Sequence, residues 1–106
     1  MHYILFYDVV DDYLERRAPF RGLHLKKVRE AYERGELVLA GALTEPDDGA
    51  VLVFRGPSPD AAEAFARSDP YVTNGVVTAW RVRKWVTVVG DGATMPSLPD
   101  ATGHSG

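Results

Sequence analysis

The first strand-like segment of the chain, from Tyr3 to Val10, carries apolar side chains on both of its faces. Successive side chains of a strand point to opposite sides, so Leu5 and Tyr7 face one way while their neighbours face the other. A sheet built on this segment cannot expose either face to water without loss of stability. The sequence therefore predicts helices over one face and a second protein layer over the other.

A helical period replaces the strand pattern from Pro19 to Arg34. Proline suits the first turn of a helix, and Gly35 suits the position just after its end. A shorter helical piece over residues 11–18 would bring Arg17 near the same side of the chain. The side expected to be buried carries Phe20, His24, Val28, Ala31 and Tyr32.

Three further strands and a second helix are expected after this helix. Residues 37–43 and 50–54 read as a hairpin, because a Pro-Asp-Asp-Gly turn separates them. Ser58 begins a helix that runs to about Arg67 and ends at Asp69, since a residue before proline is disfavoured in the helical region. Residues 76–89 alternate as one strand of about 45 Å, which should bend or extend onto a partner.

The order β-α-β-β-α-β is the split βαβ arrangement of a ferredoxin-like α+β domain. In this fold a four-stranded antiparallel sheet carries both helices on one face. We expect residues 1–89 to form one such domain and residues 90–106, rich in Gly, Pro, Ser and Asp, to form a flexible tail. The second apolar sheet face predicts a homodimer that packs sheet to sheet, as in a dimeric α+β barrel.

Composition excludes several partners. Twelve basic and 15 acidic residues are interspersed over 106 positions, so no positive surface is expected for nucleic acid. No apolar run approaches the roughly 20 residues that a membrane span needs, and the first residues lack the basic start of a signal peptide. The absence of cysteine fits a reducing compartment. A soluble, cytoplasmic protein is expected.

His24 lies in the middle of the helix side that should be buried. A lone histidine there is more often a core residue with one hydrogen bond, and an Asp before Pro is often only a turn residue. In a split βαβ fold, however, the end of the second helix approaches the middle of the first, so Asp69 can reach His24. A carboxylate at that place would fix the tautomer of the imidazole and stabilise its charged form, as a general acid or base requires.

Metal and cofactor sites are not indicated by the sequence. The three histidines, His2, His24 and His104, are far apart, and no spacing places two of them on one face. The Gly90-Asp91-Gly92 segment opens no helix, as a dinucleotide site would require. We therefore expect neither a metal nor a cofactor.

Several of these features together resemble the YCII-related family across residues 1 to about 86. They are Arg17, His24-Leu25, Gly35-Glu36-Leu37, Ala40-Gly41, Asp69-Pro70-Tyr71 and Gly75, with Trp85 matching the family's aromatic residue near the end of the last strand.

The resemblance implies a ferredoxin-like homodimer with a His/Asp active site. It assigns the catalytic roles to His24 and Asp69, and it makes Arg17 a contact for an anion. Gly41-Ala42 stands where the family often has Gly-Pro, so the wall of the cleft is expected to differ there.

The leading functional hypothesis is a cofactor-independent small-molecule enzyme of the lyase or isomerase type. His24 would move a proton on an anionic ring or carbonyl compound, oriented by Asp69, while Arg17 binds the substrate anion. Tyr7 and Tyr71 are further candidates for substrate binding, with core packing as the alternative. Two other hypotheses stay open: a non-catalytic ligand-binding or accessory module, and a cofactor-free ferredoxin-like monooxygenase.

Overall fold

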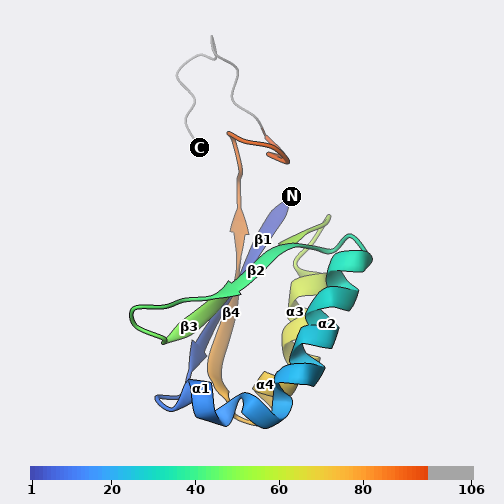
Figure 1. The fold of residues 1–106 in the computed structure, drawn as a ribbon. Coiled ribbons are helices and arrows are strands. Elements are labelled where there is room, and N and C mark those ends of the chain that lie inside the picture. The colour runs from blue at the N-terminus through green and yellow to red at the C-terminus, as the bar shows by residue number, and fades with distance from the viewer. Residues whose placement is uncertain (96–106) are drawn as a thin grey trace.

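The computed structural model describes residues 1–95 and contains one four-stranded antiparallel sheet. Figure 1 shows the two longer helices together on one side of this sheet. The strands, in the spatial order β2-β3-β1-β4, are β1 (His2–Val9), β2 (Leu37–Ala42), β3 (Gly49–Arg55) and β4 (Val77–Trp85). The longer helices are α2 (Arg21–Glu33) and α3 (Asp60–Ser68). The predicted ferredoxin-like α+β fold is confirmed.

The core lies between the helices and one face of the sheet. On the central strand β1, Leu5 pairs with Leu52 of β3 and with Val82 of β4, and Leu5 is fully buried. Phe54 and Phe65 pack against each other beneath the helices, with ring centroids 5.5 Å apart. The alternation of β1 thus places its odd-numbered residues in the core, as the sequence predicts.

No helix within the described residues covers the other face of the sheet, and residues 86–93 reach this face at its end near His2. Ile4 and Phe6 of β1 lie on this open face and are half-buried. At its two edges Leu39 of β2 is 71% exposed and Trp85 of β4 is 46% exposed. The two-faced apolar pattern is therefore real, and only one of its two faces is covered by helices.

The helix expected from Pro19 to Arg34 begins later, at Arg21, and the shorter helical piece expected over residues 11–18 is present. A short helix α1 (Tyr13–Arg16) and a 3₁₀ turn (Ala18–Phe20) precede α2. Tyr32 was expected on the buried side, but it is 63% exposed. Because β2 is the edge strand, no further strand lies beyond it to cover the ring.

The last strand is shorter than residues 76–89, the range expected from its pattern. Trp85 pairs with His2, the first residue of β1, so no ladder partner remains for the residues that follow. The chain turns back at Gly90 and Gly92, which both adopt positive φ. The Thr94 amide then donates to Thr87 Oγ1 at 3.0 Å, so the first part of the predicted tail folds onto Thr87. The rest of that tail, residues 96–106, lies outside the described residues.

No helix within residues 1–95 has the length and apolar character needed to span a bilayer.

Candidate active site

Asp69 occupies the junction between α3 and the short helix α4 (Pro70–Thr73). Its backbone is extended, with φ −67° and ψ 125°, as expected for a residue that precedes proline. α3 therefore ends at Ser68, and Asp69 caps α4, where its Oδ1 accepts the backbone N–H of Tyr71 at 3.0 Å. The Asp69-Pro70-Tyr71 sequence thus ends α3 and fixes the Asp69 carboxylate in the interior of the protein.

The Asp69 carboxylate is fully buried and accepts hydrogen bonds from three groups. His24 Nδ1 lies 2.9 Å from Oδ1 and 3.0 Å from Oδ2, and the Tyr7 hydroxyl donates to Oδ2 at 2.7 Å. The backbone N–H of Tyr71 is the third donor. The contact between His24 and Asp69 predicted from the sequence is therefore present.

The His24 ring is packed against aromatic side chains in addition to its hydrogen bond to Asp69. It stacks on Tyr71 with centroids 3.8 Å apart and planes 7° apart, and Phe65 packs edge-on against it. Because a carboxylate only accepts hydrogen bonds, Nδ1 must carry a proton, and in the neutral ring Nε2 carries the lone pair. Every buried side-chain N or O of the described residues has a hydrogen-bond partner, whereas Nε2 of His24 has none among these residues. Nε2 is therefore accessible from outside the core.

A cavity of about 160 Å³ adjoins His24 between the first helices and the edge of the sheet. Its polar lining comes from Tyr13, Arg17, Arg21, His24 and Tyr71. Small residues of β2 form part of the opposite wall, including Gly41 and Ala42, the two positions at which a difference from the family was expected. The structure thus brings Arg17 and Tyr71 into the cavity of His24.

Arg17 and Arg21 give this cavity its positive charge. The Arg17 guanidinium lies 4.9 Å over the Tyr13 ring and donates to the Tyr13 hydroxyl at 3.2 Å. Within residues 1–95 neither arginine forms a salt bridge with a carboxylate. Both can therefore receive an anion, for which a guanidinium is well suited.

Arg21 lines the cavity but was not predicted as a site residue, although the sequence contains a signal for it. Arg21 lies three residues before His24 in α2, and residues three apart share a helix face. A cation one turn before a candidate base could have been included on that ground.

The two tyrosines proposed as substrate contacts have different positions. Tyr71 lines the cavity; burial raises its pKa, and the charges of Arg17 and Arg21 act in the opposite direction. Tyr7 is not among the residues that line the cavity, and its hydroxyl faces Asp69 instead. Burial raises the pKa of Tyr7, and the neighbouring Asp69 charge raises it further. The Tyr7 hydroxyl already donates to Asp69, and a substrate contact by Tyr7 stays a prediction.

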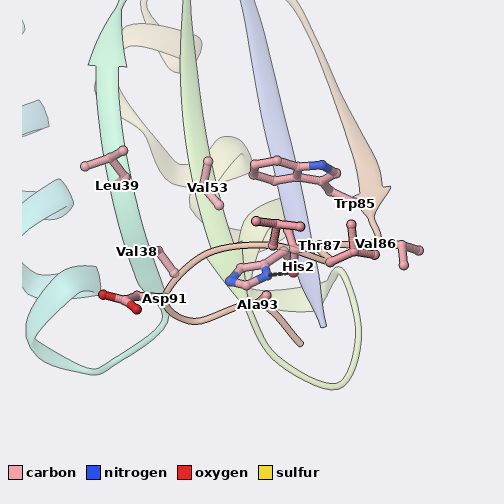
Figure 2. Close-up of a pocket in the computed structure, with 11 residues that line it drawn as sticks. His2, Val38, Leu39, Val53, Trp85, Val86, Thr87, Asp91 and Ala93 are labelled. Atoms are coloured by element: carbon pink, nitrogen blue, oxygen red, sulfur yellow. Dashed lines mark hydrogen bonds between the residues drawn. The ribbon is translucent and has the colours of Figure 1, made fainter. Parts of the chain in front are cut away.

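A second cavity, of about 470 Å³, opens on the side of the sheet away from the helices (Figure 2). Its walls are mostly apolar, and His2 Nδ1 lies 2.8 Å from Thr87 Oγ1 within it. Burial lowers the pKa of His2, and the N-terminal charge acts in the same direction. Trp85, which matches the family's aromatic residue, lines this cavity and not that of His24. Asp91 also lines the larger cavity, but His2 is hydrogen-bonded to Thr87 and forms no ion pair with Asp91, so the smaller cavity, where a histidine and a carboxylate are in contact, is the candidate active site.

His24 and Asp69 are the two side chains of the site that could bind a metal ion. No group of three His, Cys, Asp or Glu residues suited to a metal occurs in the part of the chain that the structure describes.

Comparison with known proteins gives consistent results from sequence and structure. The model of the YCII-related domain matches residues 1–86. Protein YciI of Escherichia coli O6:H1 is 31% identical over 85 residues, which cover 72% of this chain and 87% of that protein. An uncharacterised protein of Haemophilus influenzae is 28% identical over 85 residues, with the same coverage.

Among solved structures, the chain is similar to 5-chloro-2-hydroxyhydroquinone dehydrochlorinase (TftG) from Burkholderia phenoliruptrix AC1100, in complex with 2,5-dihydroxybenzoquinone. The TM-score is 0.69 at 18% sequence identity, over 82% of this chain and 95% of that chain. At this level of identity the similarity demonstrates a shared fold.

Proposed function

The chain belongs to the YCII-related family, and we propose that it is a small-molecule enzyme of the lyase or isomerase type in which His24 moves a proton. One observation carries the proposal: Nδ1 of His24 is held by a buried carboxylate at 2.9 Å, while the ring lines a cavity that also contains two arginines. A base, the group that orients it and sites for an anion are thereby found together.

In the proposed reaction, Nε2 of His24 takes a proton from a hydroxyl group or from a carbon next to a carbonyl. The electron pair stays on the substrate as a phenolate or enolate, and Asp69 stabilises the imidazolium that forms. In a lyase a leaving group then departs with its bonding electrons; in an isomerase the proton returns to a different atom. In this scheme His24 both removes the proton and, in an isomerase, returns it.

The proposed substrate is a compact ring compound with anionic oxygens. Arg17 and Arg21 would bind those oxygens, and the Tyr71 ring forms an aromatic part of the wall. A cavity of 160 Å³ has room for about five water molecules at roughly 30 Å³ each, which suits a single small ring. The ring compounds named for the dehydrochlorinase belong to this class.

We further propose that a second copy of the chain covers the open face of the sheet. Leu39 and Trp85 expose large apolar surfaces there, and such surface is normally buried in a partner. Interaction with nucleic acid is not part of the proposal, and a cytoplasmic location stays a prediction from the cysteine count.

The proposal predicts halide release without a cofactor. The purified chain, incubated under nitrogen with 5-chloro-2-hydroxyhydroquinone and a panel of other halogenated hydroxyhydroquinones, should release halide faster than buffer or a His24→Gln variant. Ion chromatography measures the halide, and absorbance follows the quinone product.

Two other outcomes would contradict the proposal. Ring compounds that bind tightly and are all recovered unchanged would identify a binding module. Turnover that appears only when oxygen is admitted would favour the monooxygenase hypothesis.

A further inference from the structure

We infer that Tyr7 is a positioning residue whose hydroxyl, donated to Asp69, weakens the hold of that carboxylate on the proton of His24. The consequence of this hydrogen bond for turnover rests on the proposed function, whereas its effect on the titration of His24 can be measured without any substrate.

The Tyr7 hydroxyl donates to the Asp69 carboxylate, and Tyr7 is not among the residues that line the cavity. Tyr7 belongs to the central strand β1, where it pairs with Ala50 and Trp80, and it is only 2% exposed. The separation of 2.7 Å from Oδ2 of Asp69 is typical of a strong hydroxyl–carboxylate hydrogen bond. Oδ2 also lies 3.0 Å from His24 Nδ1, so the phenol and the imidazole share one oxygen.

Tyr7 must act as a donor at every pH at which a histidine titrates. The carboxylate offers no proton, and both burial and the charge of Asp69 raise the pKa of the Tyr7 phenol. The phenol therefore stays protonated and removes part of the negative charge that Asp69 would otherwise direct at His24.

The remaining charges near His24 leave this effect distinguishable. Arg17, at the end of α1, and Arg21, on the same helix as His24, line the cavity and are the same in the wild type and in a Tyr7 variant. Tyr13 of α1 and Tyr71 of α4 are neutral neighbours. None of these four residues forms a hydrogen bond with Tyr7, whose hydroxyl donates to Asp69, so loss of that hydroxyl acts on His24 through Asp69.

Tyr7→Phe removes one oxygen atom and keeps the buried ring. Asp69 then has one donor fewer, its charge acts more strongly on the imidazolium, and His24 should titrate at higher pH than in the wild type. NMR titration of the His24 ring carbon–proton signals measures this. Tyr3→Phe is the matched control, because Tyr3 lies on the same face of β1, is also buried and makes no side-chain contact with Asp69. It should leave the titration unchanged.

A second replacement tests the opposite direction in case Tyr7→Phe does not fold. Incorporation of 3-fluorotyrosine at position 7 makes the phenol a stronger donor, so His24 should titrate at lower pH. Where turnover is measurable, the activity ratio of wild type to Tyr7→Phe should rise between pH 8 and pH 6, by up to about tenfold. An unchanged His24 titration in both proteins, or shifts of the opposite sign, would overturn the inference.

Discussion

Replacing His24 by Ala is expected to lower turnover by about 10²- to 10⁴-fold, the contribution typical of a positioned proton-transfer group. The loss should appear in kcat more than in KM, because Arg17 and Arg21 remain to bind the anion. Steady-state kinetics with a ring compound that the wild type converts measures both constants.

The His24→Ala result needs variants that separate chemistry from packing. His24→Gln keeps a side chain that can donate to Asp69 but offers no base, so its turnover should fall nearly as far. Lys26→Ala is the matched control, since Lys26 is exposed on the same helix and does not line the cavity. Turnover within a few-fold of wild type in a folded His24→Gln protein would contradict a catalytic role for His24.

Replacing Asp69 by Ala is expected to cost about 3 kcal/mol or more in the free energy of unfolding, at about 1 kcal/mol or more for each of the three donors that lose their acceptor. The substitution leaves the buried Tyr7 hydroxyl, the Tyr71 amide and His24 Nδ1 without their acceptor. Such unsatisfied groups are costly because water cannot reach them readily. Urea unfolding at neutral pH measures the loss.

Two further variants make the Asp69 prediction specific. Asp69→Asn keeps the shape and one oxygen acceptor for the Tyr71 amide, so it should lose less stability than Asp69→Ala while losing most of the activity. Asp47→Ala, in the exposed turn before β3, should be near neutral. If Asp69→Ala were as stable as Asp47→Ala, the carboxylate would not hold the site together.

The meeting of His24 and Asp69 could be predicted because it depends on features that a sequence displays directly. Helical spacing placed His24 on the buried side, Pro70 fixed where the second helix stops, and the order of elements put both helices on one face of the sheet. The first two steps rest on backbone geometry that is local to a few residues, and the third rests on the order of the elements along the chain.

The role of Tyr7 could not be predicted in the same way. Strand alternation shows that Tyr7 points toward the helices, but not which atom its hydroxyl reaches across 62 residues of sequence. The prediction that Tyr32 is buried was wrong for a related reason. Its position in the helix was assigned correctly, but which strand forms the edge of the sheet is a property of the assembled fold.

We propose that Asp69 fixes the neutral His24 ring with its proton on Nδ1, which leaves Nε2 as the base that faces the cavity. The most direct measurement is ¹⁵N NMR of the His24 ring in the wild-type protein at a pH where the ring is neutral. We expect a protonated Nδ1 and a lone pair on Nε2 in the wild type, and we expect Asp69→Asn to shift the proton toward Nε2. A neutral ring that carries its proton on Nε2 in the wild type would contradict it.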